Sequence, residues 1–322
     1  MKVVLQKNLY ERGQTIFDQS SKVHGIEYML TDVLDETAML QYHRQGIMCF
    51  VIGAEKYSDE FYQTIAENSA VIRFGIGYNA IPVNICRERN IKVAYTPGTL
   101  TQSVAEFTFA LLLALARNIP ALDASVKDGK WKGSSGLELA GKTLAILGFG
   151  QIGQAVARMA KYGFLMKVNA YDIQTANKPE FVDLLSSDYG VTVHDADFIS
   201  MHMATLPETT GFFNTQRIKQ CKNGVFFINT ARGELVAEHD LFEALLSGKI
   251  AKAALDVFCK EPYNPDLSVD FRKLDNVLLT PHCGSNTREA NNKMAEAVVA
   301  NILAYFNHME MALVPELKCS NL

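Results

Sequence analysis

The chain has 322 residues, 48% of them hydrophobic, with a formal net charge of −4. This length and apolar content suffice for a large core in one or two domains. The scattered charges offer no basic surface for nucleic acid or for an anionic membrane. The N-terminus turns polar too soon for a secretory signal, and no apolar run is long enough to span a bilayer, so we expect a globular cytoplasmic protein.

In the first third of the chain, short apolar runs alternate with longer amphipathic stretches. Such an alternation of strands and helices is typical of a doubly wound parallel sheet. The predicted fold class is therefore α/β, with a doubly wound parallel sheet in this region. The predicted strands are Val3–Leu5, Ile26–Leu30, Met48–Ile52, Val71–Phe74 and Ile91–Ala94.

The next segment is predicted as one long apolar helix over Thr101–Arg117, followed by a loop-rich passage over Asp123–Gly136. A second strand series then predicts a second parallel sheet. Its strands are expected at Leu144–Leu147, Met166–Tyr171, Phe198–Met201, Val225–Asn229, Ala253–Leu255 and Val277–Leu279.

A final helix is expected over Thr287–Phe306, with an apolar stripe typical of a core-facing helix. The stripe consists of Met294, Val298, Ile302 and Tyr305. The two strand series, separated by the long helix and the loop-rich passage, predict two parallel-sheet domains.

The strand Leu144–Leu147 runs into a glycine-rich turn that carries the strongest functional signal. Gly148 permits a tight turn, Gly150 lets the backbone approach a pyrophosphate, and Gly153 lets the following helix pack closely. Asp172 ends the next strand about 20 residues further on, where an acid binds the adenosine ribose and repels a 2′-phosphate. The pattern therefore predicts that the cofactor is NAD rather than NADP. The expected contacts are Gly148, Gly150, Gln151, Ile152, Gly153 and Asp172.

Three further strand ends carry side chains suited to carbonyl chemistry. Arg232 follows the strand Val225–Asn229, and its planar fork can bind a carboxylate bidentately. Glu261 and His282 follow the last two strands. A carboxylate beside an imidazole stabilises the imidazolium, so such a pair can donate a proton near neutral pH. The six cysteines show no metal-ligand spacing, and we expect reduced thiols and no metal site.

At these residues the sequence resembles the D-isomer-specific 2-hydroxyacid dehydrogenases. The motifs are GFGQIG with Asp172, NTARGELV, ALDVFCKEP and LLTPHCGSNT, in the family's order, and the match runs from about Val71 to Phe306. The resemblance implies that Arg232 orients the substrate, that His282 exchanges the hydroxyl proton and that Glu261 holds His282. These three are the expected catalytic residues.

The resemblance also implies the domain organisation: a discontinuous, flavodoxin-like substrate or lid domain (1–98 and 287–322) and a dinucleotide-binding Rossmann domain (99–286). It further implies additional contacts and a homodimer through the Thr101–Arg117 region. Amides of the segment RFGIGYN, at Gly75, Ile76 and Gly77, would bind the substrate carboxylate together with Arg232. The further cofactor contacts would be Met203, Thr230, Ala231 and Asp256. The expected partners are thus a small 2-oxo or 2-hydroxy acid and a second copy of the chain.

Several alternatives remain open from the sequence. The nearest branch is that of phosphoglycerate and hydroxypyruvate–glyoxylate enzymes, but phosphoglycerate members usually carry an Arg where this chain has Ile52-Gly53-Ala54. Because a phosphate needs a cationic partner, unphosphorylated 2-oxoacids rank above 3-phosphoglycerate. Two further alternatives are an NAD-binding corepressor of the same fold and an NAD-dependent oxidase of another small anion such as phosphite. A formate-oxidising relative would have Gln in place of Glu261.

Overall fold

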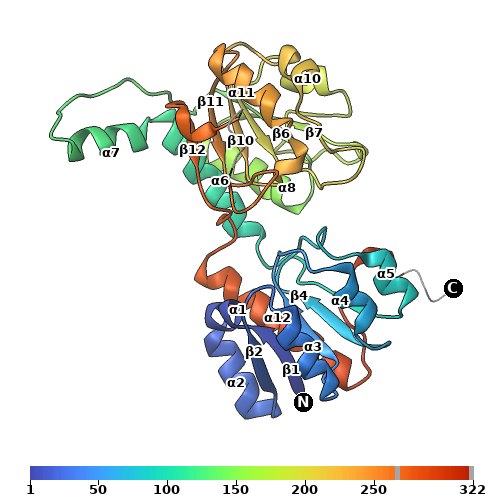
Figure 1. The fold of residues 1–322 in the computed structure, drawn as a ribbon. Coiled ribbons are helices and arrows are strands. Elements are labelled where there is room, and N and C mark those ends of the chain that lie inside the picture. Colours follow the sequence, from blue (N-terminus) through green and yellow to red (C-terminus); the bar gives the residue numbers. More distant parts are fainter. Residues whose placement is uncertain (265–268, 319–322) are drawn as a thin grey trace. The chain divides into compact units, whose positions relative to one another are not determined.

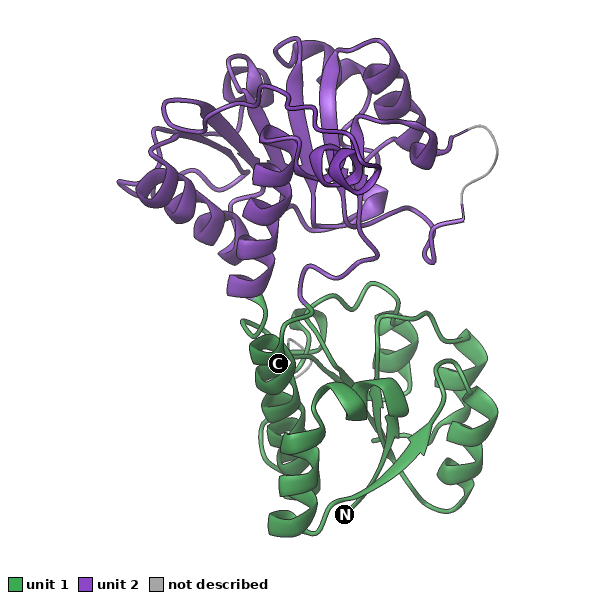
Figure 2. Cartoon of the chain, turned by 90° about the vertical axis from the view of Figure 1, so that its left-hand side faces the viewer, with its two compact units in different colours: residues 1–100, 286–322 green, residues 101–285 purple. Residues whose placement is uncertain are grey.

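The computed structural model describes residues 1–264 and 269–318. The chain divides into two compact units: unit 1 contains Met1–Leu100 and Asn286–Leu322, and unit 2 contains Thr101–Ser285 (Figure 2). The boundaries expected from the sequence, after residues 98 and 286, fall close to these points. Each unit is described by itself below.

Unit 1 is built on a five-stranded parallel sheet in the order β2-β1-β3-β4-β5. The strand order reverses between β1 and β3, which makes that point the topological switch of the sheet. All four residues of β3 and of β4 are buried, as expected for central strands covered on both faces. The strands are β1 (Lys2–Gln6), β2 (Glu27–Thr31), β3 (Cys49–Ile52), β4 (Ala70–Arg73) and β5 (Lys92–Ala94).

Two groups of helices cover this sheet. On one side α1 (Lys7–Arg12) and α2 (Gln14–His24) pack with α12 (Arg288–Phe306), which also contacts β4 (Figure 1). The other group contains α3 (Glu36–Arg44), α4 (Asp59–Thr64) and α5 (Val83–Glu88), and α13 (Pro315–Lys318) packs against α5.

The apolar stripe of α12 explains why the end of the chain returns to unit 1. Met294, Val298 and Ile302 are buried, whereas Tyr305 is half-buried and donates its hydroxyl to the carbonyl of Asn68. The hydroxyl of Thr287 accepts a hydrogen bond from the amide of Ala290 and caps the helix at its predicted start.

Unit 2 contains a seven-stranded parallel sheet in the order β12-β11-β10-β9-β6-β7-β8. Its switch point lies between β6 and β9, so the fold is the doubly wound dinucleotide-binding arrangement that the sequence predicts. The prediction missed β8, a half-buried edge strand of three residues whose short run carries little pattern. The strands are β6 (Thr143–Leu147), β7 (Lys167–Tyr171), β8 (Leu184–Ser186), β9 (Phe198–Met201), β10 (Val225–Asn229), β11 (Ile250–Leu255) and β12 (Val277–Leu279).

The longest helix of unit 2, α6 (Thr101–Ala116), packs on β10, β11 and α8 (Gln151–Arg158). The prediction of a loop over Asp123–Gly136 was wrong at its beginning, because α7 spans Ile119–Lys127. The glycines that suggested a loop begin only at Gly129, whose φ of +76° lies beyond the helix. The remaining helices are α9 (Tyr189–Val193), α10 (Thr215–Gln220) and α11 (Glu238–Leu246).

Two sequence expectations concern cysteines and membrane spans. The five cysteines in the described part of the chain are free, and Cys319 lies outside the described residues. Among the described residues, no single helix has the length and apolar content to cross a bilayer; α6 and α7 reach them only together, and the chain bends by 62° between the two.

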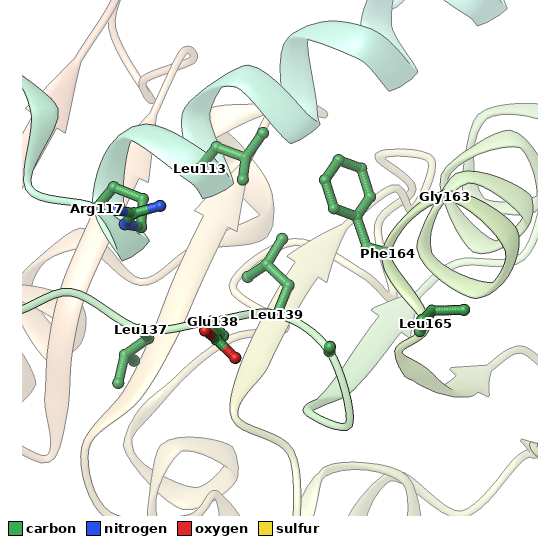
Figure 3. A pocket seen from close by; sticks show the side chains of 9 residues that line it. Leu113, Arg117, Leu137, Glu138, Leu139, Gly163, Phe164 and Leu165 are labelled. Carbon is green, nitrogen blue, oxygen red and sulfur yellow. The ribbon is translucent and has the colours of Figure 1, made fainter.

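An apolar pocket of about 330 Å³ opens at the edge of unit 2 where β6 and β7 begin (Figure 3). Leu113 and Phe164 project into it from the end of α6 and from the turn before β7. None of the predicted site residues lines it, because those follow the opposite, carboxyl ends of the strands. The lining is Leu113, Arg117, Leu137, Glu138, Leu139, Ala140, Gly163, Phe164 and Leu165.

Candidate active site

The glycine turn after β6 has the backbone that a dinucleotide site needs. Gly148 has a φ of +94°, and a Cβ there would lie 2.6 Å from the amide nitrogen of Met203. A Cβ at Gly153 would collide with the carbonyl of Gly148, so the third glycine lets α8 start against the turn. A Cβ at Gly150 would meet nothing within 4 Å. The turn is therefore open at the point where a pyrophosphate would approach the amino end of α8.

Asp172 is held by the turn that it is predicted to serve. Its Oδ2 accepts the amide of Phe149 at 2.8 Å, and its Oδ1 accepts the amide of Gln174 at 2.9 Å. Each carboxylate oxygen retains a lone pair for a ribose hydroxyl. The next side chain, Ile173, is 84% exposed and carries no charge for a 2′-phosphate. These features fit NAD.

His202 packs behind the same turn and stays neutral. Burial lowers the pKa of His202 to about 3, and its Nε2 lies 2.7 Å from the hydroxyl of Ser200. Gly148 packs against the backbone of His202 and Met203. His202 therefore positions the turn, and Met203 is half-buried beside it.

Arg232 follows β10 in a turn organised by a strand-end asparagine. The side chain of Asn229 accepts the amide of Ala231 at 3.0 Å and donates to the carbonyl of Arg232 at 2.9 Å. Burial lowers the pKa of Arg232, while the carboxylates of Glu234 and Glu261 act in the opposite direction. A guanidinium stays charged at any working pH, so the turn presents a half-buried cation. Asn229 was not among the predicted site residues, although an Asn at the end of a strand is a known turn signal.

Thr230, another predicted cofactor contact, lies in the same turn. It is 8% exposed, and its hydroxyl lies 3.0 Å from that of Thr108 on α6. This contact joins the turn after β10 to the long helix that packs on the sheet.

Glu261 and His282 are brought together as predicted from their strand ends. Oε2 of Glu261 lies 2.6 Å from Nδ1 of His282, and its Oε1 accepts the amide of Phe258 at 3.0 Å. Burial works to raise the pKa of Glu261, but its contacts with His282, the Phe258 amide and Arg232 lower it overall. The side chains are 34% and 35% exposed, so the pair is open to a ligand.

Asp256 fixes the loop that carries His282. Its carboxylate accepts the hydroxyl of Thr280 at 2.6 Å and the amides of Cys283 at 2.9 Å and Gly284 at 2.8 Å. His282 itself has a φ of +50°, a conformation that a non-glycine residue adopts only when its surroundings impose it. Asp256 is 1% exposed, so its main observed task is to hold this loop.

In unit 1, the predicted substrate turn follows β4 and is built around Arg73. The guanidinium donates to the carbonyl of Gly77 at 2.8 Å and to that of Phe74, so both carbonyls face inward. The amide of Gly75 donates to the carbonyl of Arg73 at 3.0 Å. The Gly75 amide is therefore less available to a ligand than the amides of Ile76 and Gly77. Arg73 is 9% exposed and places a buried positive charge behind the turn.

Comparisons with known proteins show the family of the chain. Residues 109–284 match the family model of the D-isomer specific 2-hydroxyacid dehydrogenase NAD binding domain. A glyoxylate reductase of Thermococcus litoralis is 39% identical over 263 residues, which cover 78% of each chain. A hydroxypyruvate reductase of Thermotoga maritima is 39% identical over 257 residues, 78% of this chain and 82% of that one. A crystal structure of a protein from Thermus thermophilus matches with a TM-score of 0.84 and 32% identity, over 97% of this chain and 99% of that one.

These matches define first a class, the two-domain dinucleotide-dependent oxidoreductases. More specifically, the chain belongs to the D-isomer-specific 2-hydroxyacid dehydrogenase family. It is an NAD-dependent oxidoreductase that acts on the CH–OH group of 2-hydroxy acids.

Proposed function

We propose that the protein reduces small, unphosphorylated 2-oxoacids to D-2-hydroxy acids with NADH. The observation that carries this proposal is the arrangement of Arg232, Glu261 and His282 at the carboxyl ends of β10, β11 and β12, three adjacent strands. Together they offer a fixed cation, a proton donor and a carboxylate that stabilises the charged form of that donor.

Arg232 orients the substrate. Its guanidinium can take one carboxylate oxygen and the carbonyl oxygen of a 2-oxoacid at once, because its donors form a rigid planar fork. The contacts of Asn229 with the backbone around Arg232 fix the start of this side chain. In reduction, the same guanidinium stabilises the negative charge that develops on the carbonyl oxygen.

His282 supplies the proton. Its Nδ1 is engaged with Glu261, which leaves Nε2 as the nitrogen that faces substrate. Protonated His282 donates from Nε2 to the oxygen on C2 during reduction, and neutral His282 accepts that proton during oxidation. Glu261 stays ionised in both directions because its pKa is lowered, and it stabilises the imidazolium.

The residues of unit 2 fit NAD. Bound NADH supplies the hydride equivalent that C2 of the substrate receives. The amides around Gly150 would hold the pyrophosphate and Asp172 would hold the ribose hydroxyls. Along the same edge of the sheet we assign further contacts to Gln151, Ile152, Met203, Thr230, Ala231 and Asp256.

The turn after β4 supplies substrate recognition in unit 1. Amides of Ile76 and Gly77, backed by the charge of Arg73, would bind a carboxylate. The loop after β3 contributes Gly53, Ala54 and Glu55, none of which has a cationic side chain, and the nearest cation, Lys56, is exposed. This supports an unphosphorylated substrate.

We also propose that the protein is a homodimer, and that α7 rather than α6 carries the contact. Most of the apolar residues of α6 are buried within unit 2, whereas α7 has no buried residue and extends away from the body of the unit (Figure 1). Ile119 is 52% exposed and Trp131, in the segment after α7, is 94% exposed. Analytical sedimentation tests this proposal. We expect a dimeric wild type and a weaker dimer in Trp131→Glu, and a monomeric wild type would contradict the proposal.

The function itself is tested by NADH consumption with glyoxylate, pyruvate, hydroxypyruvate, bulky 2-oxoacids and 3-phosphohydroxypyruvate. D- and L-hydroxy acids with NAD test the reverse direction. We expect turnover of an unphosphorylated 2-oxoacid and oxidation of the D isomer only. Oxidation of the L isomer, or turnover of the phosphorylated substrate alone, would contradict the proposal.

A further inference from the structure

A cluster of buried polar side chains lies at the switch point of the sheet in unit 1. Gln6 ends β1 and Tyr57 follows β3, and both are 0% exposed. Nε2 of Gln6 donates to the hydroxyl of Tyr57 at 2.6 Å and to Oε2 of Glu55 at 3.3 Å. Ligands of doubly wound sheets bind outside the carboxyl ends of the strands at such a switch point.

Two oxygens of this cluster lack a partner. Among the described residues, Oε1 of Gln6 and Oγ1 of Thr31 are buried without a hydrogen bond. Gln6 and Thr31 are register partners on adjacent parallel strands, so their side chains share one face of the sheet. A buried polar atom without a partner costs free energy, so such atoms are the exception and indicate a missing donor or acceptor.

Gly53 leaves room for this arrangement. A Cβ there would collide with Oε2 of Glu55 and would lie 2.8 Å from Oε1 of Gln6. Both acceptors therefore converge on the bare backbone of Gly53. Glu55 is half-buried and outermost, so rotation of its side chain would expose Gln6.

Two carboxylates lie beside the buried cluster, while the neighbouring cation, Lys56, is exposed. The carboxylates of Glu55 and Glu36 both act on the Tyr57 hydroxyl, and Glu36 accepts the amide and the hydroxyl of Ser58 at 2.6 Å each. Acceptor oxygens and carboxylates attract a hydrogen-bond donor and repel a second anion.

The cluster also lies near the proposed carboxylate turn within the same unit. The amide of Phe74 donates to the carbonyl of Ile52, so Gly53 and Gly75 end neighbouring strands. Adjacent strands are ~5 Å apart, which is within the reach of a small 2-oxoacid.

We propose that Gln6, Gly53 and Glu55 form a subsite for a hydroxyl group on the side chain of the substrate. A 2-oxoacid bound by its carboxylate at Ile76 and Gly77 would place its C3 substituent toward Glu55 and Gln6. The hydroxyl donates to Oε1 of Gln6 or to Glu55, and a phosphate or a second carboxylate is repelled. This inference rests on the proposed function and adds the substrate class to it.

The test compares hydroxypyruvate with pyruvate, which differ by one hydroxyl on C3. We expect the wild type to favour hydroxypyruvate in kcat/KM by at least about tenfold. Gln6→Met, which keeps the bulk but removes the amide, should bring this ratio close to one. Because both rates come from one preparation, the fraction of folded enzyme cancels from the ratio, and the ratio reports only the folded variant.

Glu55→Gln separates charge from shape. It should raise kcat/KM for 3-phosphohydroxypyruvate relative to hydroxypyruvate by about tenfold, since it removes a like charge. Glu67→Gln is the matched control. Glu67 is an exposed carboxylate of unit 1 that precedes β4, and so it lies at the amino ends of the strands, away from the subsite.

A binding measurement needs no turnover. Calorimetric titration of D-glycerate and D-lactate into the NADH-saturated enzyme should show tighter binding of D-glycerate, and Gln6→Met should abolish the difference. A wild-type ratio near one, or an unchanged ratio in Gln6→Met, overturns the subsite while leaving the proposed function intact. Failure to reduce any 2-oxoacid overturns the proposed function instead.

Discussion

The two sheets end in carboxyl edges of similar construction and different chemistry. In unit 2 the edge carries ionisable side chains on consecutive strand ends, including Arg232 and the Glu261–His282 pair. In unit 1 the edge carries a backbone turn, neutral side chains and the carboxylates of Glu55 and Glu36. Its only buried cation in the described residues, Arg73, donates to carbonyls of its own turn. Under the proposed function, the same topology supports reaction at one edge and recognition at the other.

This difference leads to a general expectation about substitutions at the two edges. Changes at the edge of unit 2 should lower kcat for every substrate, whereas changes at the edge of unit 1 should alter KM and the choice of substrate. The predictions below test that division, beginning with the largest effect.

His282→Asn should reduce kcat by ~10²–10⁴-fold with all 2-oxoacids, because it removes the proton donor but keeps a polar side chain of similar size. Fluorescence titration should show that NADH still binds. His194→Asn is the control, because His194 also pairs with a carboxylate, Asp195 at 2.8 Å, but is exposed. A loss below tenfold would be too small for a general acid.

Arg232→Ala should cost at least ~2–3 kcal/mol in kcat/KM, and Arg232→Lys should also be damaging because a lysine cannot bind bidentately. Steady-state kinetics on pyruvate would measure both. Arg272→Lys is a matched control, since Arg272 makes a two-bond pair with Asp270 outside the strand-end site. Near-normal turnover of Arg232→Ala would make this residue structural.

The sequence predicts the residues at these edges where the pattern that identifies them lies within one short segment. The glycine turn and Asp172 are recognisable because each glycine has a steric reason within its own loop, as at Gly148 and Gly153. Arg232, Glu261 and His282 were predicted as a set because each follows an apolar strand by three to six residues, and parallel strands end at the same edge.

The missed features depend on contacts between distant residues or on weak patterns. Gln6 and Glu55 meet across strands that are far apart in sequence, and their composition alone gives no sign of it. Asp256 was interpreted as a cofactor contact, whereas the structure shows that it also holds residues 280–284. α7 lacks a buried face, so nothing in its periodicity separates it from a loop.

Arg73→Met should raise KM for all 2-oxoacids by about tenfold and change kcat less, because the turn carbonyls lose their charged donor and the turn amides lose their orientation. Initial-rate kinetics with pyruvate and glyoxylate would show the split. Arg89→Met is the control, since Arg89 donates to the carbonyl of Ile65 in the same unit without touching the turn. A fall in kcat with an unchanged KM would contradict the division between the edges.

The smallest expected effect concerns pH and tests whether Glu261 tunes the acid. Reduction requires protonated His282, so its rate falls as pH rises, whereas oxidation requires neutral His282 and gains rate over the same range. The pKa of Glu261 is lowered, so it is ionised throughout this range and stabilises the imidazolium. Glu261→Gln removes that charge, so both pH profiles should move to lower pH.

The measurement is kcat/KM against pH in both directions. Glu234→Gln is the matched control, because Glu234 acts on Arg232 and is not bonded to His282 in the described part of the chain. A shift in Glu261→Gln alone identifies the direct hydrogen bond as the cause, because a general change in local charge would move both variants. An unchanged profile in Glu261→Gln would leave His282 as the acid and limit Glu261 to holding the ring in place.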